Sequence, residues 1–276
     1  MVIYELDKKD FFKVGHLLKG DLVNIEIKGV VQGFNQGSVF VDNLKKPKTA
    51  MVWSKAIDGF YFIGDENNKD FNDYINNYID IEINQRAKAL GLDSFEFSGT
   101  SLKWDLTFKS IFKNRKLSKS KQLTYKYKDI IDVHFKDIKL EKQFKILKVN
   151  KSLFKKEISN LDFVKSMILD WWESLEDLFD YGVGFCIIHN KKIVSCCISS
   201  CVTLDSMGSH TITLKDFRKK GLARKLITRY LKYCKDNNFE PNWDCMETNL
   251  SSRYLAESCG YKKEFDYNLY EFKFRD

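Results

Sequence analysis

The sequence predicts an α/β (α+β) fold in two domains, and three observations support this. The chain has 276 residues, more than one domain usually contains. Its second half alternates short apolar runs, typical of strands, with segments whose apolar residues recur at helical spacing. These segments follow the order β-α-α-β-β-β-α-β-α-β, so we expect a sheet flanked by helices. We place the two domains at residues 1–125 and 126–276.

The first half is predicted to be an α/β domain. Residues 23–31 alternate apolar and polar positions in the manner of a strand, and a hairpin is expected from residues 37–44 to residues 49–53. The basic segment 113–128 contains few large aliphatic residues, which indicates either the domain connection or an edge strand followed by a loop. A helix with an aromatic face is indicated by side chains four residues apart, at Trp104, Phe108 and Phe112.

The elements of the second half are more clearly marked. A tight turn at Asn190 and Lys191 joins two apolar strands into a hairpin. The expected strands are residues 144–149, 182–188, 192–200, 208–214, 241–246, 261–263 and 269–274. The expected helices are a short one from Leu153, then residues 161–175, a helix from Leu222, and residues 250–259.

The composition indicates a protein able to bury a core, since 43% of residues are hydrophobic and 30% are charged. The net charge of +8 is spread through lysine-rich segments. It favours anionic ligands without identifying one, and a solvated lysine-rich surface is the simpler interpretation. The first residues contain no apolar signal core, and no segment is apolar enough to cross a bilayer. We therefore expect a cytoplasmic protein without a membrane partner.

The cysteines favour reduced thiols. All seven lie between Cys186 and Cys259, and an odd number without a secretion signal argues against a disulfide framework. Cys196 and Cys197 are adjacent in an apolar run, so their side chains point to opposite faces of a strand. We expect no structural metal.

The strongest functional signal lies in residues 213–230, which indicate a strand end, a tight basic turn and an amphipathic helix. Leu222 and Leu226 begin the apolar face of that helix. Gly221 and Ala223 keep bulky side chains away from its first turn. The free N–H groups there, with the positive end of the helix dipole, form a site suited to phosphate.

This arrangement resembles the GNAT acetyltransferases. Their R-x-x-G-x-A turn is matched by Arg218, Gly221 and Ala223, and their next motif is matched by Asn249, Ser252, Leu255, Gly260 and Tyr261. The chain resembles in particular the zwittermicin A resistance type, through Thr213, Phe217–Ala223, Pro241, Trp243, Asp244, Cys245, Ser252, Leu255, Ala256, Gly260 and Tyr261. The resemblance covers residues 182–274 and implies a central mixed, mostly antiparallel sheet flanked by helices.

The resemblance implies acetyl-CoA as the cofactor and a small-molecule primary amine as the acceptor. The backbone of Thr213, Leu214 and Lys215 would then pair with the pantetheine arm. The pyrophosphate would be held by Lys219, Lys220, Gly221, Leu222, Ala223, Arg224 and Lys225, with charge added by Arg218 or Arg224. Asn249 and Ser252 would line the pantetheine channel, although both residue types also cap helices.

The catalytic groups implied by the resemblance are only partly present. Many relatives place a tyrosine, the acid for the departing thiolate, where this sequence has Ala256, and a glutamate where it has Gly208. His210 could accept a proton through water near neutral pH, and Asp244 is another candidate base; Tyr254 is the candidate for the missing acid. A CoA thiolate could still leave without a dedicated acid, since a free thiol has a pKa of about 8.5.

The sequence is also compatible with two other functions and with an internal duplication. The missing tyrosine and glutamate favour a module that binds CoA as a sensor or interaction protein with little turnover. Nucleic-acid binding through residues 113–128 has little support beyond Tyr125 and Tyr127, so no specific nucleic-acid partner is expected. Residues 39–53 form a hairpin built like that at residues 185–196, which suggests that the first domain is a degenerate GNAT-like copy without a phosphate turn.

Overall fold

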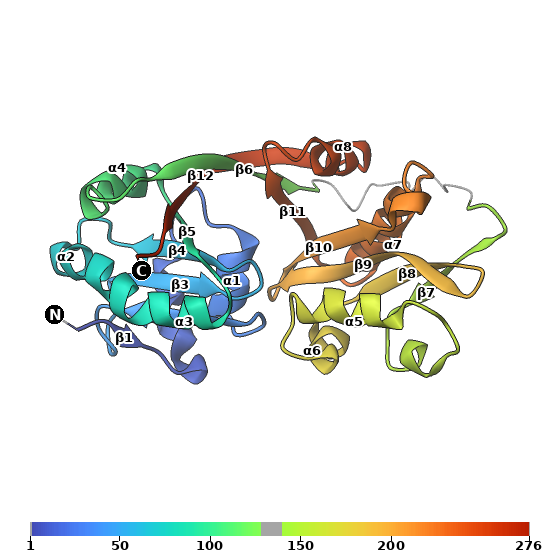
Figure 1. Cartoon of the computed structure of the whole chain (residues 1–276), viewed down its shortest axis with the longest axis horizontal. Coiled ribbons are helices and arrows are strands. Elements are labelled where there is room, and N and C mark those ends of the chain that lie inside the picture. The colour runs from blue at the N-terminus through green and yellow to red at the C-terminus, as the bar shows by residue number, and fades with distance from the viewer. Residues whose placement is uncertain (1, 128–139, 276) are drawn as a thin grey trace. The chain divides into compact units, whose positions relative to one another are not determined.

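The computed structural model describes residues 2–127 and 140–275 (Figure 1). The chain divides into two compact units: unit 1, Met1–Leu123 with Phe265–Asp276, and unit 2, Thr124–Glu264. The expected division assigned the whole C-terminal end to the second domain. The part of the last strand from Phe265 onward belongs instead to unit 1, where Tyr270 to Lys273 pair with Phe97 to Ser94.

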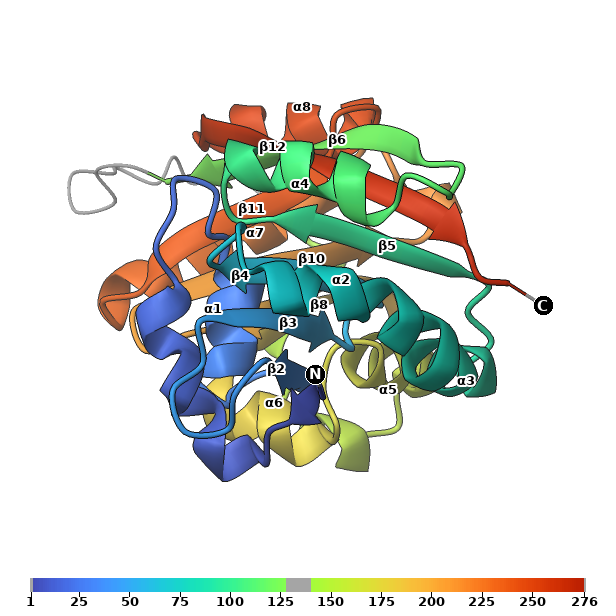
Figure 2. The same cartoon turned by 90° about the vertical axis from the view of Figure 1, so that its left-hand side faces the viewer.

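Unit 1 contains a mixed sheet in the order β1-β2-β3-β4-β5-β12 (Figure 2). Its strands β2, β3 and β4 are antiparallel neighbours, whereas β4 and β5 run parallel. The strands are β1 (Tyr4–Glu5), β2 (Gly37–Val41), β3 (Thr49–Ser54), β4 (Gly59–Gly64), β5 (Ser94–Gly99) and β12 (Lys262–Lys273). The helical segments are η1 (Lys8–Leu17), α1 (Ile25–Val31), α2 (Lys69–Tyr78), η2 (Ile79–Ile83), α3 (Asn84–Ala89) and α4 (Leu102–Ile111).

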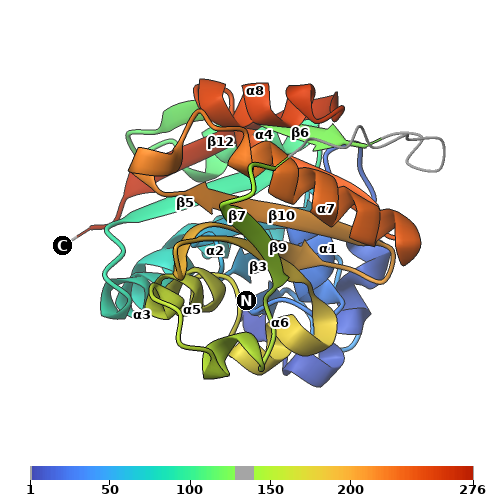
Figure 3. The same cartoon turned by 90° about the vertical axis from the view of Figure 1, so that its right-hand side faces the viewer.

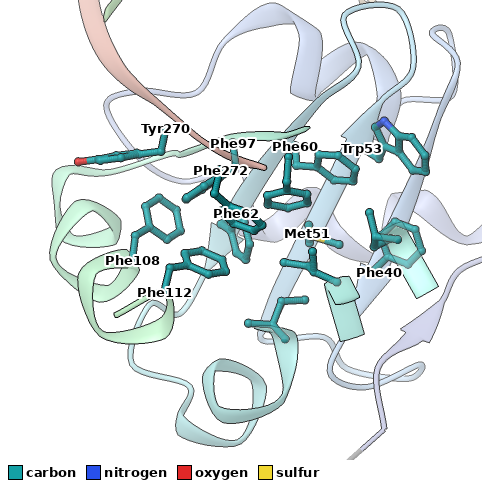
Figure 4. Packing of buried hydrophobic residues seen from close by; sticks show 14 of the residues in the cluster. Phe40, Met51, Trp53, Phe60, Phe62, Phe97, Phe108, Phe112, Tyr270 and Phe272 are labelled. Carbon is teal, nitrogen blue, oxygen red and sulfur yellow. The ribbon is translucent and has the colours of Figure 1, made fainter. Parts of the chain in front are cut away.

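Two apolar layers stabilise unit 1, one on each face of its sheet. In the first, alternate strand residues such as Phe40 and Phe62 pack with buried residues of α2, α3 and α4. Figure 4 shows its aromatic rings, and Phe62 contacts the rings of Phe71, Phe97, Trp104, Phe108 and Phe112. In the second, the intervening strand residues such as Val39 and Ile63 pack against η1 and α1. The alternation of strand side chains thus fills both layers.

Residues 25–31 form helix α1, so the strand predicted for residues 23–31 is wrong. The reason lies at Asn24, whose side-chain oxygen accepts a hydrogen bond from the N–H of Ile27 and caps the helix. Alternating β-branched residues favour a strand locally. Here the cap and the burial of Ile27, Val30 and Val31 in the second apolar layer outweigh that preference.

The segment predicted as a domain connection contains a strand. Residues Ser118–Lys126 form β6, and Lys128, the last residue of the predicted segment, lies outside the described residues. A strand is present, as the alternative expected, and the boundary between the two units also falls inside the segment, at Leu123 and Thr124. The strand is held by Tyr125, which is buried and donates a hydrogen bond from its hydroxyl to Glu257.

In unit 2 the strands follow the order β6-β11-β10-β9-β8-β7, with both parallel and antiparallel pairs. Figure 3 shows α7 on one side of strands β8 to β10 and α5 and α6 on the other. The strands after β6 are β7 (Phe144–Lys148), β8 (Gly184–His189), β9 (Lys192–Val202), β10 (Ser206–Thr213) and β11 (Glu240–Met246). The helical segments are η4 (Leu153–Lys155), α5 (Leu161–Leu169), α6 (Leu175–Tyr181), η5 (Lys215–Phe217), α7 (Leu222–Asp236) and α8 (Leu250–Ser258).

The two units repeat one order of elements. In unit 1 three antiparallel strands are followed by helices, a parallel strand β5 and helix α4. In unit 2 the antiparallel strands β8, β9 and β10 are followed by α7, a parallel strand β11 and helix α8. The hairpins that suggested a duplication occupy equivalent places, as β2 with β3 and β8 with β9.

Candidate functional site

The candidate site of unit 2 begins where two parallel strands part. Strand β10 pairs with β11 only through Ser206, Met207 and Gly208, and beyond Gly208 it stays paired with β9 alone. A β-bulge lies at this point, between Met207 and Ser209. The carbonyl of Gly208 accepts a hydrogen bond of 2.7 Å from the hydroxyl of Tyr230 on α7, which fixes the bulge. A gap between β10 and β11 follows from this geometry.

Backbone groups of β10 open onto the gap. Leu214 donates its N–H to the carbonyl of Val194 on β9, so by the alternation of an antiparallel ladder Ile212 and His210 also face β9. The backbone groups of Thr211 and Thr213 then point away from β9, toward the gap. The carbonyl of Leu214 accepts from Phe217. With both of its backbone groups engaged, Leu214 is removed from the set expected to pair with pantetheine.

Helix α7 presents an uncapped, basic N-terminus. Gly221, its N-cap, has φ 73° and ψ 6°, and no side chain caps the first turn. Lys219 also has positive φ, at 61°, so the turn before the helix curls its N–H groups outward. The first turn carries no acidic residue. The side chain of Arg218 is held beside the strand end, since its Nε donates to the carbonyl of Thr213 at 3.1 Å.

The residues of the second motif act as helix caps. The side-chain oxygen of Asn249 accepts a hydrogen bond from the N–H of Ser252 at the start of α8. The hydroxyl of Ser252 accepts a hydrogen bond of 3.0 Å from the indole N–H of Trp243 on β11. Both residues therefore have structural partners, and they connect α8 to the strand that borders the gap.

His210 lies on the face of the sheet opposite to α7. Its ring is 5.2 Å from that of Trp171, which lies in the segment between α5 and α6. The next residue, Trp172, anchors this segment, because its indole N–H donates a hydrogen bond to the carbonyl of Ser199. Burial lowers the pKa of His210, and the charge of Asp170 raises it in part. The imidazole is thus held as a neutral group beside an indole wall. Sequence reasoning missed Trp171 and Asp170, since only the fold brings them to β10.

The other two catalytic candidates have different surroundings. The carboxylate of Asp244 on β11 accepts a hydrogen bond of 3.0 Å from the hydroxyl of Thr124. The side chain of Tyr254 is 75% exposed on α8, and no described residue hydrogen-bonds its hydroxyl. The structure therefore orients Asp244 and leaves Tyr254 without a positioning contact.

Unit 1 has no equivalent gap. Its parallel strands β4 and β5 pair from Gly59 to Phe62, and the N–H of Thr100 then bonds the carbonyl of Phe62 at 3.1 Å. The helix that follows β4 is capped, because Asn68 accepts a hydrogen bond from the N–H of Phe71. A Cβ at Gly99 would approach Trp104 to 2.2 Å, so aromatic packing fills the region beside β5. Neither the strand gap nor the free helix start of unit 2 recurs here.

Two negative observations apply to the described residues. No group of three or more His, Cys, Asp or Glu side chains there could hold a metal ion. No helix in the described parts of the chain is both long and apolar enough to cross a membrane. All seven cysteines are free thiols, and six are buried.

Together the fold and the site define a protein with two related α/β units, one of which carries an uncapped, basic helix start beside a strand gap. The chain belongs to the GNAT acetyltransferase family, whose model matches residues 16–270. This confirms the superfamily implied by the motifs. The match spans both units.

Similar proteins support the same family and fold. The chain is 25% identical over 270 residues to the N-acetyltransferase YdfB of Bacillus subtilis, covering 98% of each chain. A GCN5-related N-acetyltransferase-like protein from Streptococcus suis superposes with a TM-score of 0.64 at 18% identity, over 96% of this chain and 99% of the other. A tandem GNAT protein from the clavulanic acid biosynthesis pathway gives a TM-score of 0.63 at 7% identity, over 99% and 98%. The tandem neighbour agrees with a fold made of two GNAT-like units.

Proposed function

We propose that unit 2 is an acetyl-CoA-dependent N-acetyltransferase that transfers an acetyl group to the primary amine of a small molecule. The observation that carries this proposal is the parting of β10 and β11 after Gly208 and Asn242, next to the uncapped start of α7. A gap between parallel strands can take an extended, amide-containing arm, and the helix start can take the phosphates. The motif residues shared with the zwittermicin A resistance type support a small-molecule acceptor.

The chain's residues fit CoA in charge and in hydrogen bonding. The outward backbone groups of Thr211 and the N–H groups of Thr213 and Lys215 would pair with the amides of pantetheine, because the carbonyls of Thr213 and Lys215 already accept from Arg218. The N–H groups from Lys219 to Lys225 would bind the pyrophosphate, with Arg218 and Arg224 adding positive charge. Asn249 would contribute its amide N–H group, because its side-chain oxygen already caps α8. Bound in this way, acetyl-CoA supplies an activated acyl group.

His210 is the preferred base in this proposal. Its neutral imidazole can accept the proton that the amine loses on attack, directly or through one water. Trp171, whose ring lies 5.2 Å from that of His210, would hold the imidazole in place. Asp244 is the second candidate, as an oriented carboxylate able to attract an ammonium group. Tyr254 was the candidate acid, and its exposure argues against a role in proton transfer.

A two-part experiment tests the proposal. Calorimetric titration with CoA and acetyl-CoA measures binding, and thiol release with a panel of primary amines measures turnover. We expect binding with micromolar or better affinity and amine-dependent thiol release. No binding at millimolar CoA would refute the assignment of the site. Binding without turnover of any amine would favour instead a CoA-binding sensor or interaction protein.

A further inference from the structure

Two thiols of unit 2 face each other across neighbouring strands. Cys186 on β8 and Cys196 on β9 are direct partners in the antiparallel pairing of the hairpin, and both are free and fully buried. Side chains of directly opposed residues leave a sheet on the same face. Burial raises the pKa of the Cys196 thiol well above its ordinary value, and a charge on Cys186 would raise it further. The two sulfur groups are therefore close neighbours.

The hydrogen bonds of the hairpin show which kind of pair the two cysteines form. The N–H of Ser199 donates to the carbonyl of Val183 at 2.8 Å, so these two residues form a hydrogen-bonded pair. Such pairs alternate along an antiparallel ladder with non-hydrogen-bonded pairs. Cys186 and Cys196 lie three pairs further along the same register, so they form a non-hydrogen-bonded pair.

This kind of pair has the backbone geometry that a disulfide needs. Its Cα atoms are about 4.5 Å apart, and its Cβ atoms are closer than those of a hydrogen-bonded pair. A disulfide joins residues whose Cα atoms are about 4.4–6.8 Å apart and whose Cβ atoms are about 3.5–4.5 Å apart. The adjacent Cys197 differs, because it lies opposite Phe185 on β8 and Thr211 on β10. The pairing of strands thus selects Cys186 as the partner of Cys196.

The position of the pair allows slow access to a reagent. Burial raises the pKa of Cys186 to about 12, so in the closed sheet both groups are held as weakly reactive thiols. Oxidation therefore needs a local opening of the strands. Among the described strands of unit 2, β8 has only β7 between it and the end of the strand order. A β-bulge also interrupts the pairing of β8 with β9 after Ile187, the residue next to Cys186. Both features favour such an opening.

We propose that Cys186 and Cys196 are a reversible disulfide site, which reacts with a small-molecule disulfide and joins β8 to β9. One cysteine, as its thiolate, attacks a sulfur of the small disulfide, so a mixed disulfide forms and one small thiolate leaves. The other cysteine then attacks the protein sulfur of the mixed disulfide, and the second small thiolate leaves. The two protons lost by the cysteines are taken up by the two small thiolates. The protein is oxidised by two electrons and the small disulfide is reduced by two.

The bridge would stabilise unit 2 in an oxidising environment. It closes the short loop of residues 186–196 and so restricts the unfolded chain. Cys196 lies opposite Ile212 of β10, which shares a sheet face with His210, so the bridge lies on the face opposite to α7 (Figure 3). It ties together the two strands beside β10 and places no sulfur on the face that α7 covers.

Peptide mapping of the full chain tests the proposal. The protein is incubated for several hours with oxidised glutathione, the remaining thiols are blocked with iodoacetamide in denaturant, and the chain is digested with trypsin. We expect mass spectrometry to find the peptide 166–191, whose one cysteine is Cys186, linked to the peptide 193–215, which contains Cys196. Dithiothreitol should reverse the link. The melting temperature should be about 5–10 °C higher in the oxidised protein.

Two variants identify the bonded residue of the second peptide. Cys197→Ala is the matched control, because Cys197 is the next residue and is equally buried. It should form the link like the wild-type protein, whereas Cys196→Ala should lose it. A wild-type digest without the link, a link that persists in Cys196→Ala, or a melting temperature that falls on oxidation would each overturn the proposal. The wild-type digest decides even if a substitution prevents folding.

Discussion

Replacing Gly221 with glutamate should abolish cofactor binding while the protein stays folded. The φ of 73° at Gly221 costs an ordinary residue about 1–2 kcal/mol. No atom lies within 4 Å of an added Cβ, so no clash increases that cost. A carboxylate at the start of α7 regains about 0.3–1 kcal/mol from the helix dipole. The folded state should thus lose about 1 kcal/mol, a fall in melting temperature of about 2–4 °C.

The effect on binding should be much larger. A carboxylate about 5 Å from a phosphate charge is repelled by about 1–3 kcal/mol, for effective dielectric constants between 80 and 20. A pyrophosphate carries two such charges, so CoA affinity should fall by at least about 2 kcal/mol, or roughly 30-fold. Calorimetric titration of CoA into the wild-type and variant proteins measures this difference directly.

Two control substitutions separate strain from charge. Gly221→Ala introduces the left-handed strain without the carboxylate, and it should keep CoA affinity within a few-fold. Gly91→Glu places the same charge in unit 1, at a glycine with φ 78° and no atom within 4 Å of an added Cβ. It should lose a similar amount of stability and no affinity. If Gly221→Glu binds CoA like the wild type, or if Gly91→Glu weakens binding equally, the placement of the phosphate site is refuted.

Three further predictions follow from the two units and from His210. Calorimetry should find one CoA per chain, because β4 and β5 of unit 1 stay paired from Gly59 to Phe62 and leave no gap like that of unit 2. A stoichiometry of two CoA molecules per chain would contradict this prediction. Burial holds the pKa of His210 below its ordinary 6.5, so wild-type kcat/KM should fall only as the pH drops below about 6.5. The variant His210→Gln should lose most of the activity and also this fall of kcat/KM at acidic pH. If the fall at acidic pH is retained, His210 is excluded as the base. Phe62→Ala should cost about 3–5 kcal/mol in denaturant unfolding of unit 1, since five aromatic rings surround Phe62; a loss below about 1 kcal/mol would contradict the packing described.

Local sequence signals predicted much of unit 2. The turn at Asn190 and Lys191 takes positive φ at both residues, as a tight hairpin between β8 and β9 requires. Gly221 has the left-handed conformation that lets the basic turn pass into α7. Such features depend on a few neighbouring residues, so they can be recognised without the rest of the fold. The same holds for the order of strands and helices after residue 182.

Features that depend on distant residues could not be predicted. Residues 25–31 have the alternating pattern of a strand. They form a helix because Ile27, Val30 and Val31 pack in the second apolar layer of unit 1. Trp171 reaches His210 only through the packing of the segment between α5 and α6 on β10. Tyr261 could be recognised only as a motif residue, because its hydroxyl meets Ser209 of β10 only in the fold. Each of these contacts joins residues more than 30 positions apart or reverses a local preference.

The return of the last strand to unit 1 has a consequence for synthesis on the ribosome. Tyr270, Phe272 and Phe274 complete the aromatic layer of unit 1, so this unit cannot close when its first 123 residues emerge. At about 5–20 residues per second, the roughly 140 residues of unit 2 delay its completion by about 7–28 s. During that interval Phe95 and Phe97 on β5 lack their final covering strand. A chain that ended before residue 265 would therefore lack part of the aromatic layer of unit 1, although every missing residue follows unit 2 in the sequence.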